Sequence, residues 1–143
     1  MSLVQHVLVL LARVLLGMFF LWSGANQIII FWVDSVAQLA QKGLPNPEAM
    51  LALAVAAMLI GGLSLVLGLR ARWGAVVLIL FLLAATALTH DFWNEDPTTP
   101  EYVSQAIHCL KNLGLVGGLC MVLAFGPGGF SADTFLRKRP NPN

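Results

Sequence analysis

The stretch AMLALAVAAMLIGGLSLVLGL occupies residues 49–69 and contains no charged side chain. At ~1.5 Å of rise per residue, a helix of this length crosses the ~30 Å hydrocarbon core of a bilayer. Three more apolar stretches surround it, namely Val4–Phe31, Trp73–Leu88 and Ile107–Phe125. The sequence therefore predicts an all-α membrane protein, a bundle of four transmembrane helices that span about residues 4–31, 49–69, 73–90 and 105–125.

The composition supports this class and excludes others. The chain has 143 residues, of which 58% are hydrophobic and 10% are charged, whereas soluble domains carry about 25% charged residues. The net charge of +1 and the lack of a basic stripe argue against a nucleic-acid partner. With no internal repeat and no linker, residues 1–143 are expected to form one domain in the lipid bilayer. The first stretch is too long for a cleavable signal, so we expect it to be retained.

The distribution of basic residues predicts the orientation of the bundle. The link after the second span holds Arg70 and Arg72, and the tail holds Arg137, Lys138 and Arg139. The other two connections carry most of the acidic residues. Because Lys and Arg favour the cytoplasmic side of a membrane, we expect both termini in the cytoplasm (N-in and C-in) and the longer loops outside. In a bacterium the protein would lie in the inner (plasma) membrane, with these loops in the periplasm.

Local signals subdivide the connections between the spans. Asp34 is expected to cap a short amphipathic helix, Ser35–Lys42, in the first outer loop. Asn46 is expected to cap the second span and Thr99 the fourth, since a proline follows each of them. The tight link 70–72 predicts an antiparallel hairpin of the second and third spans.

Glycines supply the expected contacts between helices. Apolar side chains gain little by leaving lipid for one another, so membrane helices associate where small residues let their backbones approach. Suitably spaced glycines occur in three of the spans: Gly17 and Gly24, Gly61 and Gly68, and Gly114 and Gly118. We expect them to pack the bundle, and the lining of a ligand cleft is the alternative.

Arg13 lies inside the first apolar stretch. A guanidinium near the centre of a bilayer costs about 2.5–3.5 kcal/mol on insertion scales, so it needs a partner or a path to water. Asp133 is the only acidic residue on the predicted cytoplasmic side. A contact between Arg13 and Asp133 would dock the tail under the bundle. Snorkelling to the headgroups and binding of a lipid or ligand headgroup are the alternatives.

A polar and aromatic cluster is expected near the outer ends of the spans. Its members are Gln27, His90, Trp93, His108 and Asn112. Imidazole and amide groups there can bond the carbonyl of a quinone or of another small polar substrate in a pocket. A belt of aromatic and histidine side chains at the interface is the plainer interpretation. A metal site of two histidines and one aspartate is a third, although these residues do not follow a ligand-spacing motif.

Five segments carry a resemblance to a known family. They are ARVLLGMFFLWSG at 12–24, IGGLSLVLGLRAR at 60–72, HDFW at 90–93, KNLGLVGG at 111–118 and FGPGGFSAD at 125–133. Each segment is common in membrane proteins, but in this order and spacing the chain resembles the DoxX family of small four-helix membrane proteins. The resemblance covers roughly Leu11 to Leu136.

The resemblance implies a single integral membrane domain associated with oxidoreductases, because the family is named after a membrane subunit of a thiosulfate:quinone oxidoreductase. Arg13, His90 and Asn112 match the family pattern. Members often carry Lys where Gln27 stands here and Glu where Met58 stands. If these two positions form a charge pair within the membrane in relatives, this chain lacks that pair.

Together these features favour an accessory membrane subunit of an oxidoreductase or respiratory-type complex, in contact with quinone. The alternative is a non-catalytic structural or assembly protein of a larger membrane complex. No motif for a redox cofactor is found, so we do not expect an independent enzyme. Four spans with a single charge inside the membrane also form a poor transport path. Other membrane or periplasmic subunits are the expected partners, and a homo-oligomer is compatible with the sequence.

Overall fold

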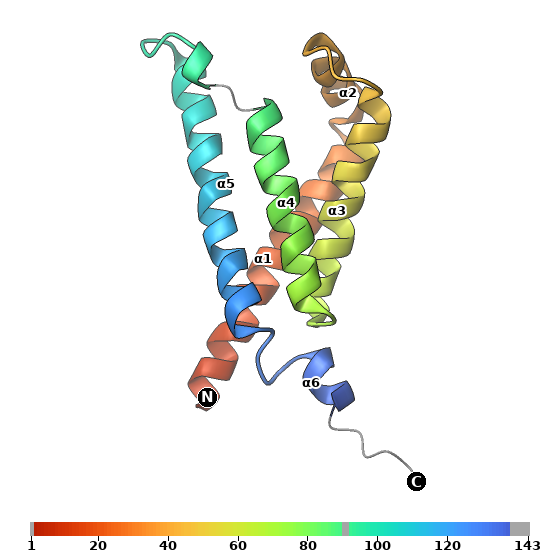
Figure 1. Cartoon of the computed structure of the whole chain (residues 1–143), viewed down its shortest axis with the longest axis vertical. Helices are drawn as coiled ribbons and strands as arrows, with labels where there is room; N and C mark the ends of the chain where they lie inside the picture. Colours follow the sequence, from red (N-terminus) through yellow and green to blue (C-terminus); the bar gives the residue numbers. More distant parts are fainter. Residues whose placement is uncertain (1, 90–91, 138–143) are drawn as a thin grey trace.

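The computed structural model of the protein describes residues 2–89 and 92–137. The features predicted at His90, Lys138 and Arg139 lie outside the described residues. Within them every regular element is a helix, and the order is α1 (Leu3–Ile29), α2 (Trp32–Gln41), α3 (Pro47–Leu67), α4 (Ala71–Thr89), the 3-10 helix η1 (Phe92–Asn94), α5 (Pro100–Phe125) and α6 (Ala132–Arg137) (Figure 1).

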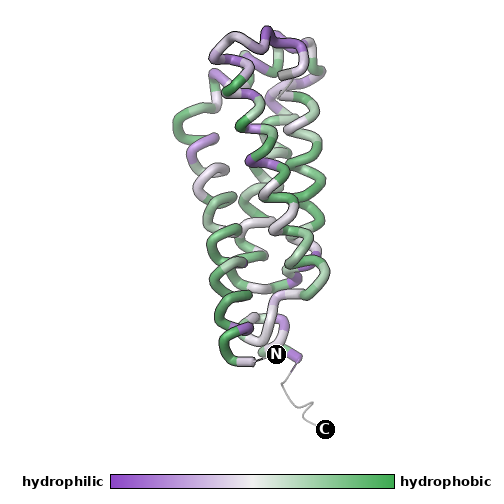
Figure 2. The backbone as a smooth tube through the Cα atoms, turned by 90° about the vertical axis from the view of Figure 1, so that its left-hand side faces the viewer, coloured by the Kyte–Doolittle hydropathy of each residue, from purple (hydrophilic) through white to green (hydrophobic). Residues whose placement is uncertain are grey.

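Four helices, α1, α3, α4 and α5, are long and apolar enough to cross a membrane. Large apolar side chains on their outer faces lie open, and Leu15, Leu53 and Leu80 are exposed by 71%, 73% and 62%. Figure 2 shows a mostly hydrophobic bundle with hydrophilic residues gathered at its upper end. Such a surface is stable in lipid and costly in water. The prediction of an all-α, four-span membrane protein is confirmed.

The helix starts agree with the sequence analysis at one of three predicted caps. Thr99 Oγ1 accepts a hydrogen bond from the Tyr102 N–H at 3.3 Å, as expected. Asn46 makes no side-chain cap because its backbone is left-handed (φ 50°), whereas a capping residue is extended. Asp34 is not a cap either, since α2 begins two residues earlier at Trp32. The chain turns almost directly from α1 into α2 through the bond from the Phe31 N–H to the Asn26 carbonyl.

The helices pack in a row that follows the chain. α1 lies along α3, α3 forms the predicted antiparallel hairpin with α4, and α4 packs on α5. The backbones of α1 and α3 approach each other at Gly17 and Gly62, where a Cβ on Gly17 would stand 2.7 Å from the Gly62 carbonyl oxygen. Small residues therefore set the distance between α1 and α3, as the physics of helix association in lipid requires.

Of the other glycines expected at helix contacts, Gly24, Gly61 and Gly118 lie close to a neighbouring helix, whereas Gly114 does not among the described residues. A Cβ on Gly61 would meet Leu78 of α4 at 2.6 Å, one on Gly24 would meet Leu59 at 3.0 Å, and one on Gly118 would meet Leu16 at 3.3 Å. A Cβ on Gly114 would meet nothing within 4 Å in the described part of the chain. The expected packing of Gly114 within the bundle is therefore not found, because its face of α5 points away from the other helices.

The bundle has two unlike ends (Figure 1). We call the end with the start of α1, the α3–α4 link and residues 126–137 the terminal end, and the end with residues 30–46 and 92–99 the loop end. α1 and α5 touch little along their length. In Figure 1 they lie close near the terminal end and diverge toward the loop end.

Candidate functional site

A cavity of about 950 Å³ opens at the loop end of the bundle. α2, α3, α4 and α5 contribute most of its wall, and Gln27 contributes from α1. It forms here because α1 and α5 diverge and α2 spans part of the opening. This volume lies within the range of pockets that hold small molecules and cofactors.

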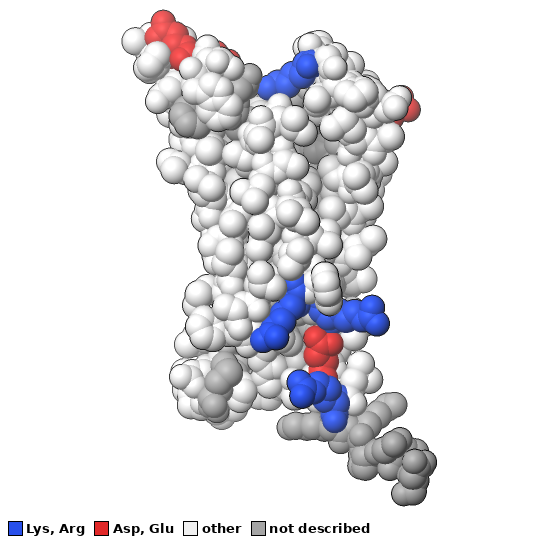
Figure 3. All heavy atoms as spheres, in the orientation of Figure 1, with Lys and Arg blue, Asp and Glu red and all other residues white. Residues whose placement is uncertain are grey.

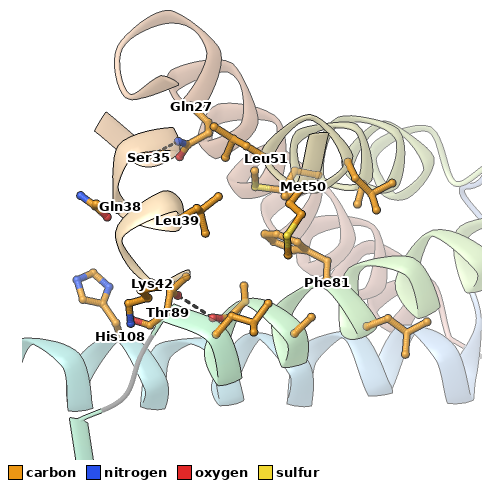
Figure 4. Close-up of a pocket in the computed structure, with 18 of the residues that line it drawn as sticks. Gln27, Ser35, Gln38, Leu39, Lys42, Met50, Leu51, Phe81, Thr89 and His108 are labelled. Atoms are coloured by element: carbon orange, nitrogen blue, oxygen red, sulfur yellow. Dashed lines mark hydrogen bonds between the residues drawn. The ribbon is translucent and has the colours of Figure 1, made fainter. Parts of the chain in front are cut away.

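The inner wall of this pocket is apolar. Leu39, Met50, Leu51 and Phe81 point into it from α2, α3 and α4 (Figure 4). Alanines widen it, since Ala54 and Ala57 on α3 and Ala84 and Ala85 on α4 also line the cavity. The wall therefore suits a hydrophobic ring or chain, and large side chains in the place of the alanines would fill the space.

The rim of the pocket is polar. Gln27, Ser35, Gln38, Lys42, Thr89 and His108 surround the end of the cavity nearest α2 (Figure 4). Gln27 Nε2 donates a hydrogen bond to Ser35 Oγ, and Lys42 Nζ donates to the Thr89 carbonyl at 3.5 Å. The lining residues that the structure describes include no Asp or Glu. The rim thus offers hydrogen-bond donors and one fixed positive charge.

His108 connects the rim to a second basic side chain. Its Nδ1 lies 3.3 Å from Lys111 Nζ, and Lys111 also lies over the Phe19 ring, 5.9 Å from the centroid. Which of the two groups donates in this contact depends on the tautomer of His108.

The structure divides the polar cluster predicted from the sequence. Gln27 and His108 line the pocket, whereas Trp93 is not among the described lining residues and is exposed by 59% in η1. Asn112 is buried between α4 and α5, where its Nδ2 donates to Thr86 Oγ1 at 2.9 Å. His90 lies outside the described residues.

The sequence analysis missed the contribution of α2. Ser35, Gln38 and Lys42 face the pocket because they lie three and four residues apart and so share one side of the short helix. That spacing was readable in the sequence. What could not be read was that this side of α2 faces the pocket rather than solvent.

At the opposite end, the tail closes over Arg13. This side chain is only 1% exposed, and its Nη1 and Nη2 donate to the carbonyls of Pro127 and Phe130, both at 2.9 Å. Its Nε has no hydrogen-bond partner in residues 2–89 and 92–137. The guanidinium therefore donates its hydrogen bonds to carbonyl oxygens of the glycine-rich turn, and the Asp133 carboxylate that we expected as its partner acts on it only through the attraction between their charges.

Asp133 makes a second contact between the tail and the bundle. Its Oδ1 accepts the Arg70 N–H at 2.9 Å, and its own N–H donates to the Gly68 carbonyl at 3.1 Å. Carbonyls become the partners of Arg13 because positive φ angles at Gly126 (79°) and Gly128 (77°) fold the turn back on itself. The tail is thus docked under the bundle by two separate sets of hydrogen bonds.

No group of three His, Cys, Asp or Glu side chains that could hold a metal ion occurs in the described part of the chain. The metal site considered in the sequence analysis would use His90 and Asp91, which lie outside the described residues.

Comparison with known proteins gives the family. The family model DoxX matches residues 8–91. The chain is 27% identical over 139 residues to "Inner membrane protein YqjF" of Escherichia coli (strain K12), a match that covers 97% of this chain and 99% of that protein. It is 34% identical over 68 residues to "Surfeit locus protein 4 homolog" of Schizosaccharomyces pombe, which covers 48% of this chain and 22% of that protein. No solved structure matches the chain.

The family match covers more than half of the sequence, and the similarity to the bacterial relative extends over almost all of it. The four apolar spans agree with the resemblance drawn from the sequence. This integral membrane protein belongs to the DoxX family.

Proposed function

We propose that this protein is an accessory subunit of a membrane oxidoreductase and that it binds a quinone in the loop-end pocket. One observation carries the proposal, namely a cavity of about 950 Å³ with an apolar wall and a donor-rich rim in a membrane-spanning bundle. A quinone has the matching chemistry, since it joins an apolar chain to a ring whose carbonyl oxygens accept hydrogen bonds. The association with an oxidoreductase is supported by the family resemblance.

The polar rim supplies hydrogen-bond donors for the carbonyl oxygens of the quinone ring. Lys42 Nζ, the Gln38 amide and the His108 ring are each of a type that donates hydrogen bonds to a carbonyl oxygen. The described lining residues include no carboxylate that would repel the electron-rich oxygens of a reduced quinone. We assign these three side chains to the quinone ring and the wall around Met50 and Phe81 to its apolar part.

The wall also supports a route of entry from the bilayer. Leu53, Val77 and Leu80 line the cavity and are exposed by 73%, 39% and 62% on the lipid-facing side of α3 and α4. An apolar ligand dissolved in the bilayer can then reach the pocket between these helices without crossing water. Under this proposal the chain binds and orients the quinone, and a partner subunit exchanges electrons with it.

The proposal includes the location and orientation of the protein. We place it in the inner membrane of a bacterium, which is supported by the name of the relative YqjF. The terminal end would face the cytoplasm, because Arg70, Arg72 and Arg137 lie there against the single described carboxylate of Asp133. Accessibility of tags on the N-terminus and on the loop at 92–99 in intact cells tests this orientation.

Retention of quinone tests the pocket. Protein purified in a mild detergent is incubated with a short-chain ubiquinone, and the quinone bound per chain is measured after extraction. Ala54→Trp should lower it by at least about tenfold, because the indole would occupy the cavity that Ala54 lines. Ala52→Trp is the matched control, since Ala52 lies on the same helix, is exposed and does not line the pocket.

The outcomes of this test separate the two candidate functions. An unmodified protein that carries no quinone, or equal retention by both tryptophan variants, contradicts the proposal. The alternative, a structural or assembly protein, is favoured by the open face of α5 at Gly114 and Gly117. It predicts that Ala54→Trp leaves the function of the intact complex unchanged and that Gly114→Leu impairs it.

A further inference from the structure

Three arginines gather on the surface of the terminal end, away from the loop-end pocket. Figure 3 shows basic groups around one acidic group at the base of the bundle. The exposed basic residues described there are Arg70, Arg72 and Arg137, and the acidic one is Asp133. At this end the acidic side chain is outnumbered, so the surface carries a net positive charge.

The backbone of the docked tail fixes the position of two of these arginines. Arg70 has a positive φ of 49°, and its N–H is held by Asp133 Oδ1 at 2.9 Å. Arg137 follows Asp133 by one helical turn on α6, so it lies on the same side of that helix. The Asp133 carboxylate thus ties the α3–α4 link, which carries Arg70, to α6, which carries Arg137.

These two guanidinium groups are available for a ligand. In residues 2–89 and 92–137 no hydrogen bond or ion pair is made by the side chain of Arg70 or Arg137. Arg72 is partly engaged, since its Nη2 donates to the Ala124 carbonyl at the end of α5 at 3.4 Å. A planar guanidinium with five donors matches the geometry of a phosphate group.

An apolar hollow adjoins the arginines. It measures about 500 Å³ and is lined by Leu69, Phe130, Phe135 and Leu136, together with the backbone of the glycine-rich turn. Phe135 and Leu136 of α6 are exposed by 74% and 53% next to Arg137. Trp73, on the first turn of α4, is exposed by 72% beside the link. Exposed aromatic rings next to arginines are typical of the boundary between acyl chains and headgroups.

We propose that this surface binds an anionic phospholipid of the adjacent leaflet. The phosphodiester is held by Arg70 and Arg137, and the upper part of an acyl chain lies in the hollow formed by Leu69, Phe130 and Phe135. A free phosphate would use the arginines alone and leave the hollow empty. The hollow, and its position at the ends of four spans, therefore favour a lipid.

Native mass spectrometry of the full-length protein tests the site. The protein is released from detergent micelles that contain equal amounts of phosphatidylglycerol and phosphatidylcholine, and the ratio of the two bound lipids is measured. Each arginine near a charged lipid surface contributes about fivefold in affinity, so Arg70→Gln/Arg137→Gln should lower the ratio by about 25-fold. Lys42→Gln, which removes a charge at the loop end, should leave it unchanged.

Two further measurements separate loss of the lipid site from misfolding and from binding of free phosphate. Arg70→Lys/Arg137→Lys keeps both charges and should retain most of the preference, and an unchanged unfolding temperature of the doubly neutral variant shows that it did not lose the preference by misfolding. Inorganic phosphate added at millimolar concentration should not displace phosphatidylglycerol. An unchanged lipid ratio in Arg70→Gln/Arg137→Gln, or displacement by inorganic phosphate, overturns the proposal.

Discussion

The terminal end of the bundle is closed by specific hydrogen bonds, whereas the loop end holds a cavity of about 950 Å³. At the terminal end the glycine-rich turn fills the space under α1 and α3, and Arg13, His6 and Asp133 each bond to backbone atoms. At the loop end, bonds such as the one from Lys42 Nζ to the Thr89 carbonyl at 3.5 Å lie at the rim of the open cavity. The comparison teaches that one bundle can close one end with its own tail and leave room for a ligand at the other.

Removal of the Arg13 guanidinium should have the largest effect on stability. Arg13→Met leaves the Pro127 and Phe130 carbonyls without their donors, and hydrogen bonds to charged groups contribute about 1.5–3 kcal/mol each. We expect a loss of about 3–6 kcal/mol, measured by thermal unfolding in detergent.

Arg137→Met is the control, because Arg137 is exposed and its side chain has no hydrogen bond in the described part of the chain. Equal unfolding temperatures for the two variants would show that the bonds from Arg13 to the glycine-rich turn do not stabilise the protein.

A pair of glycines, one at each end, gives the next largest effect. Gly68 (φ 66°) and Gly43 (φ 72°) are both left-handed, so alanine costs about 1–2 kcal/mol at either position. A Cβ on Gly68 would also collide with the Arg13 guanidinium and Ser131, whereas one on Gly43 would meet nothing within 4 Å. Gly68→Ala should therefore destabilise the protein more than Gly43→Ala in the same unfolding assay. Equal losses of stability in the two variants would mean that Arg13 and Ser131 move to accept the added methyl group at no cost in free energy.

The smallest expected effect is a change in the pKa of Asp96, at the loop end. Hydrogen bonds from the Thr98 N–H and hydroxyl lower the pKa of the Asp96 carboxyl below its ordinary value. A lowered pKa means that this contribution to stability is present above the ordinary pKa and is lost as the pH falls through the lowered one.

Thr98→Ala removes the hydroxyl donor and keeps the N–H, so the pKa of Asp96 should rise part of the way back. NMR titration of the carboxyl carbon measures this change. A pKa that does not move would assign the whole effect to the backbone donor.

The sequence was sufficient for the spans and insufficient for the partners of the polar residues inside them. Hydropathy predicts the four spans because a lipid surface demands apolar side chains along the whole length of a helix. The partners of Arg13 are backbone carbonyls of Pro127 and Phe130. Every residue has such a carbonyl, so the sequence does not indicate which of them accept the hydrogen bonds. For this reason the sequence pointed to Asp133, whose charge attracts Arg13 without a hydrogen bond between them, and not to the carbonyls that accept its hydrogen bonds.

The pocket was predicted in part for a similar reason. Gln27 and His108 stood out as polar residues near the ends of spans, and both line the cavity. Asn112 stood out equally, but it is satisfied by Thr86 across the α4–α5 interface. Whether a polar residue faces a cavity or a neighbouring helix depends on the rotation of the helix, which the weak amphipathicity of α5 does not specify from sequence alone.

The bonds from Arg13 to Pro127 and Phe130 join positions separated by 114 and 117 residues. During synthesis the first helix enters the membrane long before its acceptors leave the ribosome. Until then the cation must be solvated by water or lipid headgroups. A chain truncated before residue 127 would contain all four spans and still leave Arg13 without these two acceptors.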